Sequence, residues 1–273
     1  MRTNELMLYK HIEESQILSD MTFLMENYDN EYYNKEDLKG LLFDVINEIL
    51  ELSASHGFEG NLWHDYLTYL LASHENAYST ACEITGNVEG SVNAIALHDF
   101  EIFMELFQYD FGPMQEALGA SALALLWDYK GDNGHGKVFN RRIRDRICEL
   151  AGHLAKVSQK KRDSFGSEDV KRNTGNSCGT VEFKAIMTKF YKEFGVGKLG
   201  LHKAFRVEHS SEGVEIVPIT KIAHVHLDNL IGYEIPKKKL IENTEAFVAG
   251  RKANNCLLFG DAGTGKSSSI KAI

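Results

Sequence analysis

Apolar residues recur at helical spacing through most of residues 1–158. The clearest stripe follows Asn34, a residue type that favours helix N-caps, with Asp37 three positions later as in a weak capping box. Other stripes begin after Ser91 and after Pro113, since proline suits the first position of a helix. Such stripes are more often the buried faces of packed helices than cofactor sites. We therefore expect a mainly α protein that begins with a helical bundle. The apolar residues of the stripes are Leu38, Leu41, Leu42, Val45, Ile46, Ile49, Leu50, Leu62, Trp63, Tyr66, Leu67, Leu70, Val92, Ile95, Phe103, Phe107, Leu118, Leu123, Leu126, Trp127, Ile143, Ile147, Leu150, Leu154 and Val157.

The helical pattern stops at residues 159–179, where charged residues, serine, glycine and asparagine replace the apolar ones. This composition favours an interdomain linker. A further helix is predicted after Thr180, with Phe183, Ile186, Met187, Phe190 and Tyr191 on one face. Residues 204–209 and 214–220 are short β-prone segments separated by a hairpin-type loop. We expect residues 180–222 to form a small α+β segment.

Composition narrows the class of protein. The chain has 273 residues, of which 43% are hydrophobic, so it has room for one large domain or two ordinary ones with a real core. Its net charge of -9 argues against a protein that coats nucleic acid, although a local basic patch is compatible with this charge. No apolar run approaches the roughly 20 residues that span a bilayer, and charges interrupt the N-terminus where a secretory signal would be apolar. The four cysteines have no metal-type spacing, so we expect a cytoplasmic protein with reduced thiols.

The most specific motif lies near the C-terminal end of the sequence. It fits the pattern G-x-x-x-x-G-K-[ST] of a P-loop. Cys256–Phe259 form a short apolar run before it, which predicts a buried strand, and residues 267–273 can begin a helix. The context therefore supports the motif. Its residues are Gly260, Asp261, Ala262, Gly263, Thr264, Gly265, Lys266 and Ser267.

These residue types match the chemistry of phosphate binding. Gly260, Gly263 and Gly265 allow tight turns that bring successive backbone N–H groups onto phosphate oxygens. A helix that begins at the loop points the positive end of its dipole at the same anion. Lys266 would reach the β- and γ-phosphates, and Ser267 would offer its hydroxyl to Mg²⁺. We therefore predict ATP or ADP with Mg²⁺ as the ligands.

A second feature precedes the loop. Pro236 is expected to open a helix with Gly250 just beyond its end, and Leu230, Ile231 and Gly232 lie immediately upstream. This order of a hydrophobic-hydrophobic-glycine element, a helix, a strand and a P-loop resembles the opening of an AAA+ ATPase module. More narrowly, it is similar to an uncharacterised bacterial family of predicted AAA+ ATPases that is known as a domain of unknown function.

The resemblance covers about residues 225–273 and implies specific roles. Leu230, Ile231 and Gly232 would contact the adenine ring. Most AAA+ members have two prolines after the first glycine of the loop, where this chain has Asp261 and Ala262; the phosphate cradle is intact despite this departure. The resemblance also implies assembly into a homo-oligomeric ring, with the helical region recognising or regulating a protein partner.

An AAA+ ATPase also uses an acidic Walker B residue, sensor residues and an arginine finger, which all follow the P-loop in the family. Few residues follow Ser267 here. We therefore expect residues 223–273 to be the N-terminal fragment of an ATPase core, in a chain truncated after the Walker A motif. The parent protein would be an ATPase, and the chain as given would not hydrolyse ATP.

Two other functions compete with this interpretation. The first is a helical interaction module whose P-loop is a non-functional relic; replacement of Lys266 would discriminate between the two. The second is another P-loop enzyme, such as a kinase or GTPase. The element at Leu230 and the helix after it argue against that second reading, because such enzymes usually lack this lead-in.

Other candidates are weaker. His224 and His226 would face one side of a strand, yet no cysteine or acidic residue nearby completes a metal site. In three places a histidine is followed directly by an acidic residue. Neighbouring residues point in different directions on a helix, so we expect these pairs at the surface. A basic cluster is expected on a solvated helix face, with nucleic acid or an acidic partner as the alternative. The pairs are His64 with Asp65, His74 with Glu75 and His98 with Asp99, and the cluster is Arg141, Arg142, Arg144 and Arg146.

Overall fold

The computed structural model describes most of the chain: residues 1–12, 15–131, 141–164, 178–197, 205–210, 213–219 and 226–273. These residues form two compact units, Met1–Thr220 and Lys221–Ile273. The first is mainly helical with a small antiparallel sheet, which confirms the predicted fold class. Within the described residues, no helix combines the length and the apolar character that crossing a bilayer requires.

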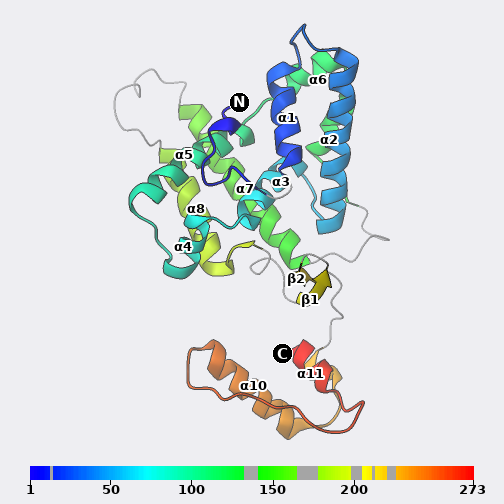
Figure 1. Cartoon of the computed structure of the whole chain (residues 1–273), viewed down its shortest axis with the longest axis vertical. Coiled ribbons are helices and arrows are strands. Elements are labelled where there is room, and N and C mark those ends of the chain that lie inside the picture. The colour runs from blue at the N-terminus through cyan, green and yellow to red at the C-terminus, as the bar shows by residue number, and fades with distance from the viewer. Residues whose placement is uncertain (13–14, 132–140, 165–177, 198–204, 211–212, 220–225) are drawn as a thin grey trace. The chain divides into compact units, whose positions relative to one another are not determined.

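The first unit is built from α-helices with short 3₁₀ turns (Figure 1). Its elements are η1 (Thr3–Glu5), α1 (Gln16–Asn27), α2 (Lys35–His56), α3 (Leu62–Ser73), α4 (Ala77–Thr85), α5 (Gly90–Phe107), α6 (Gly112–Leu118), η2 (Ser121–Leu126), α7 (Arg141–Ser164) and α8 (Cys178–Phe194). Helix α1 packs on α2, α3 on α7, and α4 on α8. Helix α5 contacts α3, α4, α7 and α8, so the core is centred on it.

Local signals explain where several helices begin and end. The Asn34 side chain accepts a hydrogen bond from the backbone N–H of Glu36, so the predicted N-cap of α2 is present. Gly57 ends the same helix in the left-handed conformation. The predicted helix from Pro113 through Trp127 is interrupted, because Gly119 adopts φ 60° and terminates α6. A 3₁₀ turn, η2, follows in place of further α-helix.

Helix α5 is buried on nearly all sides, as expected of a central helix. Its buried residues are Ala96, Leu97, Asp99, Phe100, Ile102, Phe103, Met104, Leu106 and Phe107. Helix α8 packs on α4, α5 and α7 through Phe183 and Tyr191. The sequence placed this helix outside the bundle, in a separate α+β segment, but the structure includes it in the same hydrophobic core.

The predicted linker at 159–179 is shorter in the structure at both ends. Helix α7 continues to Ser164, and α8 already begins at Cys178. The remainder of the predicted linker, residues 165–177, lies outside the described residues. Strands β1 (Phe205–Ser210) and β2 (Gly213–Pro218) pair antiparallel, from Phe205 opposite Pro218 to Ser210 opposite Gly213. This agrees with the two extended segments and the hairpin-type loop that the sequence predicted.

The second unit contains η4 (Leu227–Asn229), α10 (Glu234–Val248) and α11 (Lys266–Ala272). Helix α10 begins two residues before Pro236 and ends as predicted, with Gly250 at φ 67°. The backbone N–H of Gly250 donates to the Phe247 carbonyl, and that of Arg251 donates to the Ala246 carbonyl. This pair of bonds is a Schellman motif, which satisfies carbonyls at the helix end.

The strand predicted at Cys256–Phe259 is not formed. Residues 252–260 have no regular secondary structure, and the Leu257 and Phe259 side chains are 84% and 87% exposed. A strand needs a partner for its backbone hydrogen bonds, and the described residues of this unit contain no strand that could pair with it. The prediction was wrong for this reason, although the segment does lead directly into the glycine-rich loop.

Candidate functional site

Three glycines shape the loop that the P-loop motif predicted. Gly260, Gly263 and Gly265 adopt φ 139°, 79° and 81°, a region that residues with a Cβ rarely enter. The loop therefore depends on glycine for its backbone conformation as well as for space. Asp261 and Ala262, at the positions where most AAA+ members have proline, are exposed at the outer turn of the loop.

The loop presents its backbone N–H groups as hydrogen-bond donors. Ala262 and Gly263 form a tight turn, and among the described residues no backbone N–H of residues 261–267 makes a hydrogen bond of good geometry. Successive N–H groups of this kind form a concave donor surface, and anions bind to such nests. The glycine spacing predicted a loop of this kind, and anion binding at it stays a prediction.

The Lys266 ammonium lies within the same loop. Its Nζ donates to the carbonyl oxygens of Gly260 at 2.9 Å and Asp261 at 2.6 Å, and to Thr264 Oγ1 at 3.2 Å. Thr264 Oγ1 in turn donates to the Asp261 carbonyl at 2.9 Å. The loop therefore holds a cation beside its backbone N–H groups, so the local charge favours an anionic ligand.

Ser267 lies next to Lys266 in the first turn of α11. Its side chain is exposed, and its hydroxyl makes no hydrogen bond with a described residue. Ser269, one half-turn on, instead donates from its hydroxyl to the Gly265 carbonyl at 2.9 Å. Of these two serines, Ser267 alone has a hydroxyl that is free to bind a metal ion.

The predicted adenine element lies beside the loop. The Leu230 Cδ2 atom is 3.5 Å from the point that a Cβ on Gly265 would occupy, so the leucine side chain covers this glycine. Ile231 is 94% exposed, and Gly232 and Tyr233 both adopt positive φ, 85° and 58°. Leu230, to which the resemblance gives a role at the base, therefore lies next to a glycine of the phosphate loop.

The sequence did not predict two side chains, one that binds the backbone of the base element and one that binds the segment before the phosphate loop. Lys237 donates from Nζ to the Leu230 carbonyl at 2.8 Å. The side-chain amide of Asn243 pairs with the backbone of Asn254, accepting from its N–H at 2.9 Å and donating to its carbonyl at 2.8 Å. Lys237 belongs to a run of three lysines, and nothing in the sequence distinguishes it or Asn243 from exposed neighbours.

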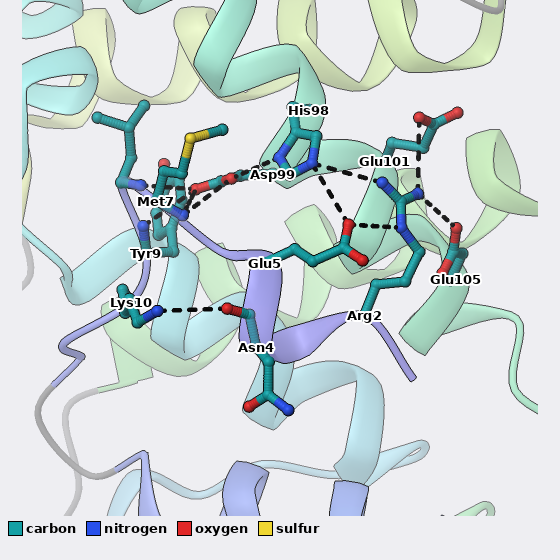
Figure 2. Close-up of polar contacts among 11 residues, drawn as sticks. Arg2, Asn4, Glu5, Met7, Tyr9, Lys10, His98, Asp99, Glu101 and Glu105 are labelled. Atoms are coloured by element: carbon teal, nitrogen blue, oxygen red, sulfur yellow. Dashed lines mark hydrogen bonds and ion pairs between the residues drawn. The ribbon is translucent and has the colours of Figure 1, made fainter. Parts of the chain in front are cut away.

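The three His-acid pairs were expected at the surface, but the acidic residue of two of them, Asp65 and Asp99, is buried. Asp99 is fully buried in α5 and accepts hydrogen bonds from the backbone N–H groups of Met7, Leu8 and Tyr9 (Figure 2). His98 Nδ1 lies 3.1 Å from the same carboxylate. This cluster anchors the N-terminal segment to α5, and its carboxylate has its partners within the protein.

Asp65, in α3, is the second buried acid. Its Oδ2 accepts a hydrogen bond from the Cys148 thiol of α7 at 3.5 Å. Burial raises the pKa of Asp65 to about 7 and that of Cys148 to about 12. Burial also lowers the pKa of His64, whose Nε2 lies 2.9 Å from the Phe107 carbonyl. These contacts join α3 to α7 and to α5.

The remaining candidates gain no support. Among the described residues, no group of three or more His, Cys, Asp or Glu could hold a metal ion. His224 lies outside the described residues, so the predicted pair with His226 is untested. In the basic cluster, Arg144 pairs with Asp145 and the Arg146 guanidinium lies 4.0 Å above the Phe194 ring. Arg146 therefore packs between α7 and α8.

Comparison with protein families gives one match. Residues 200–273 match the model of a family described as "Protein of unknown function (DUF815)", which covers the β1–β2 hairpin and the whole second unit. No curated protein and no solved structure matches the chain. The resemblance to an uncharacterised family is thereby confirmed for this segment, while the relation to AAA+ ATPases stays a prediction.

Proposed function

We propose that the second unit binds ATP, with Mg²⁺, at the loop formed by residues 260–267. The observation that carries this proposal is a loop whose backbone N–H groups, at residues 261–267, make no hydrogen bond of good geometry with a described residue. Glycines with positive φ shape this loop, and the Lys266 ammonium lies within it. A triphosphate supplies the acceptors and the negative charge that this surface lacks.

Each residue has a role in this proposal. The backbone of Asp261, Ala262, Gly263, Thr264 and Gly265 surrounds the phosphates, and Gly260 begins the turn. Lys266 exchanges its loop carbonyls for phosphate oxygens, because a charge-assisted hydrogen bond to an anion is stronger than one to a neutral carbonyl. Ser267 offers its free hydroxyl to Mg²⁺. Leu230, Ile231 and Gly232 provide the surface for the base.

The Lys266→Ala variant tests this function. We expect equilibrium titration of the whole chain with a fluorescent ATP analogue in the presence of Mg²⁺ to show saturable binding. The alanine variant should bind about 10- to 100-fold more weakly, since hydrogen bonds to charged groups contribute about 1.5–3 kcal/mol. Lys271→Ala, in the same helix, is the matched control and should bind as the wild type does. Equal affinity of wild type and Lys266→Ala would refute the proposal.

The helical unit is the part that we assign to recognition or regulation of a protein partner, and ATP binding in a homo-oligomeric assembly would drive remodelling of that partner. The competing function is an interaction module whose loop is a relic. It predicts that partner binding survives Lys266→Ala and that ATP has no measurable affinity. The same titration therefore separates the two functions.

A further inference from the structure

Helix α10 contacts both parts of the candidate site through two polar side chains on its length. Lys237 binds the base element, and Asn243, six residues later, binds the segment that leads into the phosphate loop. Six residues of α-helix rise about 9 Å, and a helix is a stiff spacer. The two contacts therefore lie at fixed positions on one rigid element.

The contact at Asn243 replaces a missing strand neighbour. A side-chain amide has one donor and one acceptor group, as a peptide unit has, and Asn243 uses both on the backbone of Asn254 at 2.8 and 2.9 Å. The same Nδ2 lies 3.2 Å from the Cys256 sulfur. Residues 252–260 form no hydrogen bonds to a neighbouring strand. The side-chain amide of Asn243 therefore fixes the position of this segment against α10.

The contact at Lys237 is equally specific. Its side chain is 13% exposed, and its Nζ bonds the Leu230 carbonyl and Glu234 Oε1, each at 2.8 Å. Leu230 lies in the turn where Gly232 and Tyr233 have positive φ, and its own side chain reaches Gly265. Lys237 therefore fixes the backbone from which the base element extends.

We propose that α10 sets the distance between the base element and the phosphate loop, with Lys237 and Asn243 as positioning residues that give the site its preference for a nucleotide over a bare polyphosphate. The proposal rests on the nucleotide binding proposed above. Neither residue needs to contact the ligand. Loss of either contact leaves the donors of residues 261–267 in place but lets the two parts of the site shift relative to each other.

The test compares two ligands on the same protein. Inorganic tripolyphosphate reports on the phosphate loop alone, and ATP reports on the loop and the base element together. The affinity ratio of ATP to tripolyphosphate, both measured with Mg²⁺ by calorimetry, therefore isolates the contribution of the base. In the wild type we expect ATP to bind more tightly.

In Asn243→Leu and in Lys237→Met this ratio should fall about tenfold, because displacement of a binding group by about an ångström removes most of its contribution. The tripolyphosphate affinity should stay within about twofold of the wild type. Asn243→Asp keeps an acceptor for the Asn254 N–H and loses the donor. Its affinity ratio should lie between those of the wild type and Asn243→Leu. Asn243→Asp also serves if the leucine variant does not fold.

One matched control lies in α10 and the other in the segment before the phosphate loop. Asn255→Leu and Lys239→Met change exposed residues of the same types, for which the structure shows no side-chain hydrogen bond, and should leave the ratio unchanged. An unchanged ratio in Asn243→Leu and Lys237→Met would overturn the inference while nucleotide binding stands, and so would an equal loss for both ligands. A wild-type protein that binds neither ligand would refute the proposed function itself.

Discussion

Asp65 is a buried acidic side chain with few hydrogen-bond partners. It is 3% exposed between α3 and α7, and its described partner is a thiol, which is a weak donor. Burial disfavours the charged form, so the carboxyl keeps its proton to a pH near 7. The helical unit therefore contains a group whose ionisation state differs between the folded and unfolded chain over the acidic range.

This difference predicts how the stability of the helical unit depends on pH. The folded-state pKa of about 7 lies above the ordinary value of about 3.9, so the folded protein binds more protons between these values. The stabilisation from Asp65 is present at low pH and is lost as pH rises toward 7. The expected fall in the free energy of unfolding between these pH values is on the order of 4 kcal/mol. Asp65→Asn cannot ionise, so we expect this variant to lack the fall.

Urea titrations between pH 4 and 8 measure this dependence. Asp44→Asn changes an exposed carboxylate of α2 and is the matched control, with the pH profile of the wild type. Parallel profiles for the wild type and Asp65→Asn would contradict the pKa assigned to this buried carboxyl.

At the residue scale, the sequence predicted the side chains that belong to a motif and missed those defined by tertiary contacts. The sequence singles out Lys266 and Ser267 because the chemistry of phosphate binding fixes their spacing in the motif. Asp65 and Asp99 were expected at the surface, because adjacent residues on a helix face different directions and the sequence does not show which face is covered. Asn243 was missed because its partner, Asn254, lies beyond the end of its helix.

At the scale of elements, a glycine inside α2 and the glycine just beyond its end should respond in opposite ways to substitution. Gly40 lies in the helix interior with open space where a Cβ would be, so Gly40→Ala should stabilise the protein by about 0.5–1 kcal/mol. Gly57 has φ 73° at the helix end, so Gly57→Ala should destabilise it by about 1 kcal/mol. Thermal unfolding measures both, and shifts of the same sign would contradict the assigned helix end.

The loop glycines should affect binding rather than stability. Gly263 has φ 79° and no atom within 4 Å of the position of a Cβ, so Gly263→Ala strains the loop backbone without a clash. We expect this strain, about 1–2 kcal/mol, to weaken ATP binding roughly tenfold. The thermal midpoint of the helical unit should not change, because the loop belongs to the other unit. Unchanged affinity would show that the donor surface does not depend on this turn.

The elements themselves were predictable wherever a local signal decided them. Apolar stripes predicted the long helices, and two short β-prone segments on either side of a turn-type loop predicted the β1–β2 hairpin. The prediction failed where a partner or a conformation decided the outcome. Gly119, in the left-handed conformation, ends α6 although the apolar stripe continues past it. Cys256–Phe259 is an apolar run typical of a strand, but no strand in the described part of the chain pairs with it.

At the scale of the whole molecule, the two units differ in how they are stabilised. Met1–Thr220 has a continuous hydrophobic core, whereas the side chains described in Lys221–Ile273 are all exposed or half-buried. Ile231, Phe247, Leu257 and Phe259 are instead exposed apolar side chains of the second unit. The free energy of folding is therefore concentrated in the first unit, since burial of apolar surface is its main source.

A chain ending at Thr220 tests this division. We expect it to unfold cooperatively on heating, because it keeps the core centred on α5. Residues 221–273 alone should show no cooperative transition, because they bury no described side chain. Calorimetry of the two pieces measures both, and a cooperative transition in the isolated 221–273 segment would contradict the assignment.

The most direct test of the central claim is an NMR titration of the whole chain, labelled at backbone nitrogen, with ATP and Mg²⁺. If the loop binds phosphate, the amide signals of residues 261–267 should shift together and saturate, because their N–H groups gain acceptors. The signals of Leu230, Ile231 and Gly232 should shift at the same concentrations. Shifts confined to other parts of the chain, or no saturable shift in the loop, would contradict the account.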